Sequence, residues 1–435
     1  MLLLGIYITI FILAYFMYTL VENRVTKKAE FQQRKTVTFG DESAVKPNRF
    51  ASIISIFVLF LIWSAFTGSA LSPVHVPGPF TGDTSFTYTA INAENQTDQA
   101  KVYVRVKPSG VKLEKPDIPA NNQLDSQQNP DRNFAVNFAR DDAVKVAAWR
   151  SALIRVQKND EGGKEKSYRV ITVDEQPIAP GQSVEVADGV VSMTRKGSLS
   201  FTPDKGWQME PIWLPAPEEV FNRLIEVARD GYQNVTLFEN IGWSLLRVMA
   251  GFLLGSLIGI PLGYAMGLSN WFRGWFDPIV EFMRPVPPLA LIPLVIIWFG
   301  IWETGKISLL FLAALWIMAI AARAGVSGVN ISKVHAAYSL GASKLQILMH
   351  IIIPNSLPEI FTGARVAMGV CWGTVVAAEL VAAEKGAGKM IIAASKFQQT
   401  DIVIMGIILI GIIGYGIDIL MRKAENCLVP WKGKS

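Results

Sequence analysis

Cysteine, histidine and charged residues are scarce in this chain. Two cysteines and three histidines among 435 residues supply neither a disulfide framework nor metal ligands at binding spacing. Charged residues make up 18% of the chain, below the roughly 25% of soluble domains, while hydrophobic residues reach 51%. No Gly-Lys-Ser or Gly-Lys-Thr closes a suitable glycine run, which excludes ATP hydrolysis through a phosphate-binding loop. We therefore expect a membrane protein that is not an enzyme and has no cofactor or metal.

Long apolar segments indicate an α-helical polytopic membrane protein. A helix needs about 20 residues to cross a bilayer. Segments of this kind predict seven membrane helices, near residues 2–21, 50–71, 241–268, 283–302, 306–326, 361–383 and 402–421. The first is expected to be a retained helix rather than a signal peptide, because no basic residue precedes its apolar run and no small-residue cleavage site closes it.

Basic residues set the expected orientation. Residues 22–49, after the first predicted helix, hold seven lysines and arginines against four aspartates and glutamates. Short loops rich in lysine and arginine stay in the cytoplasm, which places the N-terminus outside and both residues 330–358 and the C-terminal tail inside. Three lysines of a predicted outer loop count mildly against this scheme, namely Lys385, Lys389 and Lys396. The net charge of +5 is attributed to such membrane edges and not to nucleic-acid binding.

A polar region of more than a hundred residues separates the second and third predicted helices and is long enough to be a domain. Alternating β-formers predict strands at Thr84–Ile91, Lys101–Val106 and Tyr168–Val173. Residues 135–157 are ambiguous and could hold a helix. We expect a small β-rich extracytoplasmic domain over 80–206, with a structural or docking role favoured over ligand binding. After it, Pro217 is expected near the start of an amphipathic helix along the outer membrane surface.

One polar interruption between apolar segments carries the most informative motif. It runs from His335-Ala336-Ala337 through Gly341-Ala342 to Ile351 and Pro354. The alanines keep one helix face small, Gly341 permits a turn, and Pro354 is expected to stop the second of two short helices. This pattern predicts a compact docking element, with an ordinary amphipathic connector as the alternative.

The spacing resembles the EAA loop of bacterial ATP-binding cassette (ABC) importer permeases, in which a Glu usually stands at the position of His335. Further segments resemble the permeases of the nitrate, sulfonate, taurine and bicarbonate importers, and among these the taurine permeases match best. The segments are Phe272–Pro278, Arg284–Ala290, Trp298–Gly300, Glu303, Gly363–Arg365, Trp372–Thr374, Ala377–Leu380, Thr400–Asp401 and Pro430–Trp431. The resemblance covers residues 50–79 and 207–435.

The resemblance implies a type I ABC importer permease bundle in the bacterial inner membrane. Two copies would form the pore, ATPase subunits would bind the cytoplasmic loop 330–358, and a periplasmic solute-binding protein would deliver solute. It also implies a division into 1–49 (an extra helix and basic linker), 50–79 (the first family-type helix), 80–206 (the β-rich insertion) and 207–435 (a core of five membrane helices). The ATPase-coupling residues would be His335, Ala336, Ala337, Gly341, Ala342, Ile351 and Pro354. The extra helix and the insertion depart from the usual six-helix form, so the resemblance assigns them no role.

Three polar or aromatic residues within the predicted helices are candidates for the translocation pathway. Glu379 lies mid-helix, where an ionisable group is costly unless it faces protein, water or a partner, so a structural hydrogen-bonding role is the alternative. Arg284 precedes a proline-rich break and could attract an anion or anchor the helix at the interface. Trp372 could line the path or pack between helices.

The expected function is the pore subunit of an ATP-driven importer for taurine or another alkanesulfonate. Nitrate, bicarbonate or another small organic solute is the nearest alternative substrate. A membrane-anchored sensor with an extracytoplasmic ligand domain is the alternative from another class. It is disfavoured because no output domain follows the cytoplasmic loop.

Overall fold

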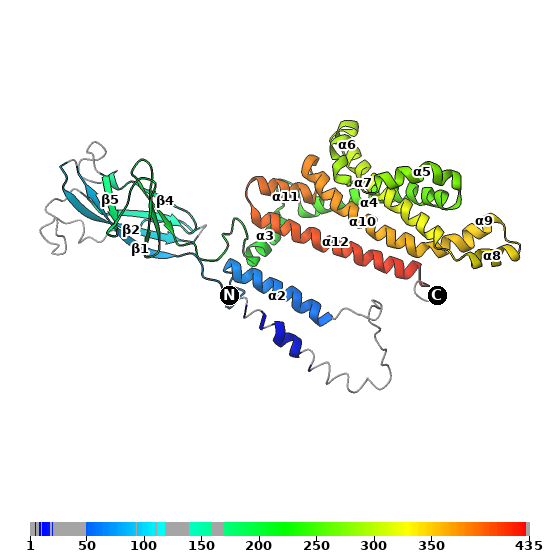
Figure 1. The fold of residues 1–435 in the computed structure, drawn as a ribbon, viewed down its shortest axis with the longest axis horizontal. Coiled ribbons are helices and arrows are strands. Elements are labelled where there is room, and N and C mark those ends of the chain that lie inside the picture. The colour runs from blue at the N-terminus through cyan, green and yellow to red at the C-terminus, as the bar shows by residue number, and fades with distance from the viewer. Residues whose placement is uncertain are drawn as a thin grey trace. The chain divides into compact units, whose positions relative to one another are not determined.

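The computed structural model describes residues 5, 8–9, 11–17, 20, 49–92, 94–108, 111–117, 139–158 and 169–431 (Figure 1). The chain divides into two compact units, Met1–Pro217 and Glu218–Ser435. Of the predicted helix 2–21, the described residues 5, 8–9, 11–17 and 20 are helical, which confirms the helix over those residues, whereas the basic linker up to residue 48 lies outside the described residues. Among the described residues, five helices are long and apolar enough to cross a membrane, or six if one bent pair counts as a single span.

The next helix of the first unit is the apolar α2, Arg49–Thr67, which confirms the helix predicted at 50–71. Gly68 follows with φ +67, a left-handed conformation that ends the helix and favours glycine. The chain then enters a β domain, defined here by its strands between Gly82 and Pro203. The two segments that flank the β domain lie together, because the amides of Trp207 and Gln208 donate to the Pro77 carbonyl at 2.8 and 3.2 Å.

The β domain contains two sheets. The first has the order β3-β2-β1-β5-β6, antiparallel except for the parallel pair β2 and β3. Its strands are β1 Gly82–Ile91, β2 Thr97–Lys107, β3 Asp142–Ala147, β5 Arg169–Val173 and β6 Gln176–Pro177. The second is antiparallel with the order β4-β9-β8-β7. Its strands are β4 Ala152–Ile154, β7 Ser183–Val186, β8 Gly189–Met193 and β9 Leu199–Pro203.

Alternating side chains of the two sheets form one apolar core. Every second residue of β2 is buried, as expected for a strand with one face inward. Phe86 of β1 stacks on Phe201 of β9, with ring centroids 6.0 Å apart, and both belong to a continuous apolar cluster in which valine is the commonest residue. The three predicted strands are therefore confirmed over their described residues. Within 139–157 the helix left open by the sequence is wrong, because this stretch holds β3, β4 and the start of the short 3₁₀ turn η3, Val156–Lys158.

The second unit is a helical bundle. The amphipathic helix predicted to begin near Pro217 is confirmed as α3, with Glu218 and Glu219 in its first turn. The long helices are α4 Leu237–Leu268, α7 Glu303–Ser327, α10 Ile353–Ala382 and α12 Thr400–Leu428, with the shorter α11 Ala387–Lys396 between the last two (Figure 1). A capping box between Thr236 and Glu239 starts α4.

Helices α4 and α7 run parallel in close contact. A Cβ added at Gly251, Gly255 or Gly263 would meet Leu310, Ala314 or Ala322 respectively. The contacts therefore progress in the same direction and at the same spacing along both helices. Small residues at this spacing let two backbones approach closely. The glycine face of α4 therefore serves core packing within one subunit.

The helix predicted at 283–302 is wrong as a single span. The structure has α5 Asn270–Met283, then the 3₁₀ turn η5 Pro288–Leu291 and α6 Ile292–Phe299, with a bend of 93° at the break. Prolines 285, 287 and 288 explain the break, since proline lacks an N–H and clashes with the preceding turn. Arg323 near the end of α7 pairs with Glu281, whereas Val295 packs on Leu309 near its start. The broken segment therefore returns the chain from one end of the bundle to the other.

The start predicted for the helix at 361–383 is also wrong. A continuous helical stretch of 38 residues, Lys344–Val381, replaces the helix expected at 361–383. Pro354 does not stop this helix, because a π-helical segment at Leu348–Ile352 comes directly before α10, whose first turn contains Pro354. The wider π turn avoids the usual contact between a proline ring and the preceding carbonyls, and proline is tolerated in the first helical turn.

Candidate functional site

The polar interruption, residues 330–358, forms two short helices joined by a tight turn. The first is α8, Ile331–Ser339, capped by the Asn330 side chain, and the second is α9, Lys344–Ile347, which starts with a capping box between Ser343 and Gln346. Gly341 lies in the turn with φ +78, and a Cβ added there would meet no atom within 4 Å. Glycine is favoured at this position because of the backbone conformation, since a larger side chain would have room.

Apolar side chains cover the outside of this loop, and they define what we call the loop face. Leu340 is 88% exposed and Leu345 is 65% exposed. The other exposed large apolar residues are Ile331, Tyr338 and Met349. Ala337 and Ile347 are buried beneath them and anchor α8 and α9. Exposed apolar side chains gathered on one small element are typical of a surface that binds a partner.

The structure brings the predicted coupling residues together on this loop, with different exposures. His335, Ala336 and Gly341 are exposed, and Ala337 is buried. The remaining three, Ala342, Ile351 and Pro354, are partly buried. The exposed His335 takes part in α8 through its carbonyl, which accepts a hydrogen bond from the Ser339 hydroxyl.

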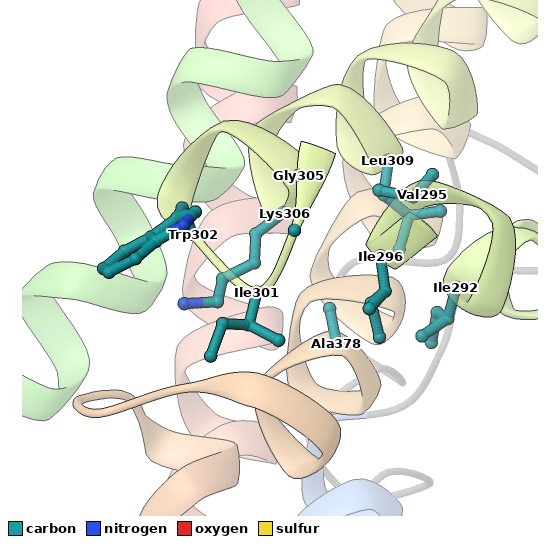
Figure 2. A pocket seen from close by; sticks show the side chains of 10 residues that line it. Ile292, Val295, Ile296, Ile301, Trp302, Gly305, Lys306, Leu309 and Ala378 are labelled. Carbon is teal, nitrogen blue, oxygen red and sulfur yellow. The ribbon is translucent and has the colours of Figure 1, made fainter. Parts of the chain in front are cut away.

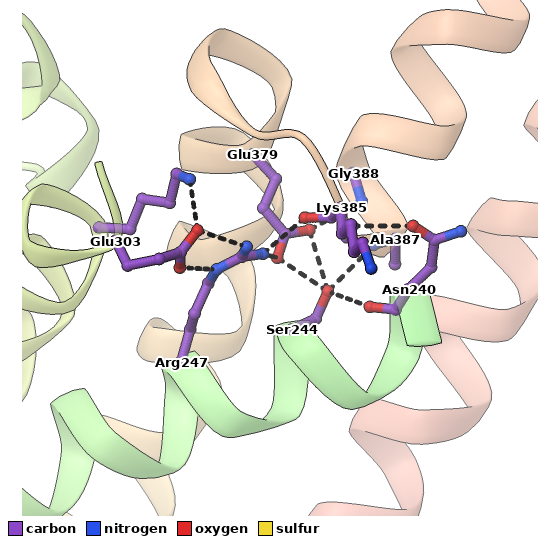
Figure 3. Close-up of polar contacts among 10 residues, drawn as sticks. Asn240, Ser244, Arg247, Glu303, Glu379, Lys385, Ala387 and Gly388 are labelled. Carbon is purple, nitrogen blue, oxygen red and sulfur yellow. Dashed lines mark hydrogen bonds and ion pairs between the residues drawn. The ribbon is translucent and has the colours of Figure 1, made fainter. Parts of the chain in front are cut away.

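A buried polar network lies at the opposite end of the bundle (Figure 3). The guanidinium of Arg247 donates two hydrogen bonds to Glu303, at 2.5 and 2.8 Å, and one to Glu379 at 2.7 Å. Lys306 donates to the same Glu303 carboxylate at 2.8 Å. Two cations and two carboxylates from α4, α7 and α10 therefore balance one another within an apolar bundle.

The network continues into the segment between α10 and α11. The Ser244 hydroxyl donates to Glu379 at 2.8 Å and accepts from the Ala387 amide at 3.0 Å. Asn240 accepts from the Gly386 amide at 2.9 Å, and Glu379 accepts from the Gly388 amide at 2.9 Å. A Cβ at Gly386 would collide with the Glu379 carboxylate, so this turn admits only glycine. Glu379 is fully buried and fully engaged, which matches the hydrogen-bonding role that the sequence left open.

Arg284 lies at the proline break, beside a cavity of about 200 Å³. Prolines of the break, Trp316 and Ile317 of α7, and Val370 of α10 contribute to its lining. The Arg284 side chain is 66% exposed, and its contact with Glu281 is long, at 3.7 Å. The indole nitrogen of Trp316 is buried and has no hydrogen-bond acceptor in the described part of the chain. A cation thus borders an otherwise apolar cavity, and the lining includes a tryptophan whose N–H is buried without an acceptor.

Trp372 packs between α10 and α12. Its indole N–H donates to the Ile410 carbonyl at 3.1 Å, its ring lies against Gly414, and the residue is only 7% exposed. It is not among the residues that line the cavity beside Arg284. The three predicted pathway residues therefore occupy three separate environments: a cavity wall, a helix interface and a buried ion network.

A second, much smaller cavity lies where α6 turns into α7 (Figure 2). Its volume is about 20 Å³, enough for a single water molecule and too small for a solute. Ile292, Val295 and Ile296 of α6 line it with Lys306, whose amine serves the polar network. This cavity is a packing feature of the Gly300–Gly305 bend.

Sequence reasoning missed Arg247 as the ionic partner of Glu379, missed Glu303 and Lys306 as further members of the network, and missed Trp316 at the cavity. A signal for the first was present, because an arginine within a predicted membrane helix requires a buried partner, and Glu379 is the matching carboxylate in another helix. Trp316 also gave a signal, since tryptophan is usual at membrane interfaces and Trp316 lies mid-helix. Among the described residues no group of three His, Cys, Asp or Glu side chains is placed to hold a metal.

The arrangement of a parallel α4–α7 pair, a broken helix and an exposed helical loop can now be compared with known proteins. Residues 251–426 match the family described as "Binding-protein-dependent transport system inner membrane component". The taurine transport system permease protein TauC of Escherichia coli (strain K12) is 46% identical over 227 residues, which cover 52% of this chain and 82% of TauC. The chain belongs to this family of ABC importer permeases.

Two further relatives are described as sulfonate and nitrate permeases. The putative aliphatic sulfonates transport permease protein SsuC of Escherichia coli (strain K12) is 38% identical over 226 residues, covering 52% of this chain and 84% of SsuC. The nitrate import permease protein NrtB of Synechococcus elongatus is 32% identical over 190 residues, covering 43% and 68%. A solved methionine ABC transporter chain is similar over 44% of this permease and 95% of that chain, at 17% identity and a TM-score of 0.41.

Family membership settles the class of protein. The permease is a multi-pass protein of the inner membrane and the non-catalytic membrane subunit of an ABC importer. Permeases of this family work with ATPase subunits and solute-binding proteins. Membership does not favour the sensor alternative.

Proposed function

We propose that this permease forms the pore of an importer for taurine or another small alkanesulfonate. The observation that carries the proposal is the 46% identity to the taurine permease over 82% of its length, above the identities to the sulfonate and nitrate permeases described above. Two copies of the chain form the pore, and a separate solute-binding protein delivers the solute.

The cavity beside Arg284 supports an anionic substrate. A sulfonate carries one negative charge spread over three oxygens, and those oxygens are hydrogen-bond acceptors. Arg284 supplies a positive charge at a cavity of about 200 Å³, and the lining residue Trp316 holds a buried N–H donor without an acceptor. Sites for drug-sized ligands span about 300–1,000 Å³, so this cavity suits a small solute. Glu379 and Trp372 serve the helix packing around the pathway and do not contact the solute.

The loop face is the proposed contact with the ATPase. Its exposed leucines, Leu340 and Leu345, fit an apolar groove, and Gly341 sets the angle between α8 and α9. ATP-driven closure of two ATPase subunits displaces the loops and turns the pore outward, and hydrolysis resets it. The orientation from basic residues places the loop in the cytoplasm and the β domain outside.

Reconstituted transport tests the proposal. The permease, its ATPase and its solute-binding protein are incorporated into liposomes, and ATP-dependent uptake of labelled taurine is measured in the presence of unlabelled ethanesulfonate, nitrate or bicarbonate. We expect taurine uptake that ethanesulfonate inhibits. Uptake of nitrate or bicarbonate without taurine would refute the substrate. Failure of the ATPase to co-purify, with uptake unchanged in Leu340→Glu, would refute the coupling role of the loop face.

A further inference from the structure

The β domain gathers four cations at one place on its second sheet. Strand β4 pairs with β9 so that Ile154 lies opposite Leu199. The residues after β4 therefore lie beside the turn that precedes β9, which closes through hydrogen bonds between Thr194 and Ser198. This register brings Arg155 and Lys158 from one segment next to Arg195 and Lys196 from the other. We call the site that they border the basic hollow.

The basic hollow is a depression of about 700 Å³ without a carboxylate in its lining. Its lining consists of Leu153, Arg155, Val156, Gln157, Lys158, Thr194, Arg195, Lys196, Gly197 and Ser198. All four cations are exposed, and none forms an ion pair within the described part of the chain.

Other cations of the same unit have carboxylate partners. Arg105 binds Asp83 through two hydrogen bonds of 2.7 and 2.8 Å, which lower the pKa of the Asp83 carboxyl. Arg150 pairs with Glu210 at 3.0 Å. Because like charges repel, four unpaired cations around one depression create a strong local positive potential that an external anion would neutralise.

The exposure of the four side chains indicates the size of the anionic partner. An exposed ion pair raises an association constant by only about 1.5- to 5-fold, so four pairs with one small anion give roughly millimolar affinity at best. A protein surface with several carboxylates gains more, because complementary charge also accelerates encounter and fixes the docking orientation. The broad, solvated depression therefore suits an acidic protein surface better than a single small solute.

We propose that the basic hollow is a docking surface for an acidic patch on the solute-binding protein of this importer. The proposal rests on the proposed function, since it requires the β domain to lie outside the membrane and the importer to receive solute from a separate protein. The β domain then serves to raise the local concentration of loaded solute-binding protein next to the pore, which the family-type helices alone do not do.

Binding to the full-length transporter tests this docking surface. Permease and ATPase are placed in nanodiscs of neutral lipid, and fluorescently labelled solute-binding protein is titrated by anisotropy at several salt concentrations. We expect each pair of charge reversals, Arg155→Glu with Lys158→Glu or Arg195→Glu with Lys196→Glu, to weaken binding about tenfold at low salt and to flatten its salt dependence. The matched control reverses Arg169 and Lys205, which are exposed cations of the same unit outside the basic hollow.

The outcomes separate this proposal from the proposed function. If taurine uptake is normal and the reversals in the basic hollow change affinity no more than the control, the docking proposal is wrong and the importer function stands. If no ATPase is retained and no solute is taken up, the proposed function itself fails. Restoration of binding by lysines on the acidic patch of the partner would support direct contact. If the four cations instead retain the nanodiscs on anionic vesicles while affinity for the partner is unchanged, a membrane surface replaces the protein partner.

Discussion

Arg247 and Glu379 form an ion pair of 2.7 Å in which the side chains are 2% and 0% exposed, respectively. Each charge lies on a different long helix, and Glu303 completes the pairing of the arginine from a third. Each charge of such a buried pair compensates the other, because either charge alone would be strongly destabilising in an apolar bundle.

The first prediction is that Arg247→Met destabilises the permease more than removal of both charges. The single change leaves Glu379 buried without its cation, at a cost of about 3–5 kcal/mol. The double variant Arg247→Met with Glu379→Gln is expected to regain part of this loss. Thermal unfolding in detergent measures both, with Arg284→Met as the control because Arg284 is 66% exposed. Additive losses in the double variant would contradict a coupled pair.

The second prediction concerns the glycines of α4. Gly255→Ala is expected to destabilise the bundle by about 1–3 kcal/mol, because the new methyl group would press on Ala314 and on the α7 backbone. Gly242→Ala is the matched control in the same helix, since an added Cβ there meets nothing within 4 Å and alanine is the better helix former by about 1 kcal/mol. Opposite shifts in melting temperature are expected. Equal shifts would contradict close packing of α4 on α7.

The third prediction separates backbone conformation from space at Gly341. Gly341→Ala is expected to strain the turn by about 1–2 kcal/mol at φ +78, although the side chain has room. Gly341→Asn should be milder, because asparagine tolerates this conformation. ATPase activity stimulated by the solute-binding protein is the readout, and alanine should reduce it more than asparagine does. The same loss in both variants would point to a side-chain clash with the partner.

The fourth prediction distinguishes cavity residues from packing residues. Arg284→Gln and Trp316→Phe are each expected to raise the KM for taurine uptake several-fold, because the first removes the positive charge at the cavity and the second removes the indole N–H of a lining residue. Trp372→Phe should leave KM within about twofold and lower stability by about 0.5–1.5 kcal/mol through the lost hydrogen bond to Ile410. Arg273→Gln serves as a charge control, since Arg273 is exposed and lies outside that cavity. A raised KM in Trp372→Phe alone would assign Trp372 to the pathway.

Local sequence signals predicted the elements that depend on local chemistry. The strands of the β domain follow from alternation, α3 from its proline and acidic first turn, and the turn at Gly341 from the conformational freedom of glycine. The expected bounds of α2, α4 and α7 were also close, because each is a long apolar run, whereas α12 extends seven residues beyond the predicted end at 421 through a charged last segment.

Non-local packing decided the elements that sequence reasoning placed wrongly. Pro354 reads as a helix stop, and only the preceding π turn makes it compatible with a continuous helix. The break at Pro285 to Pro288 was visible, but its angle and the reach of α5 depend on contacts with α7. Glu379 was recognised as costly, yet its partner could not be chosen without knowing that α4 and α7 run parallel and that α10 opposes them.

The continuous helical stretch Lys344–Val381 has one further consequence. At 1.5 Å per residue, its 38 residues form an arm of roughly 57 Å that begins beside the loop face and ends near the buried carboxylate of Glu379. A rotation of this arm by about 5° about one end displaces the other end by roughly 5 Å, close to one helical turn. Small angular changes at the end beside the loop face are therefore sufficient to reposition whole side chains at the far end of the bundle.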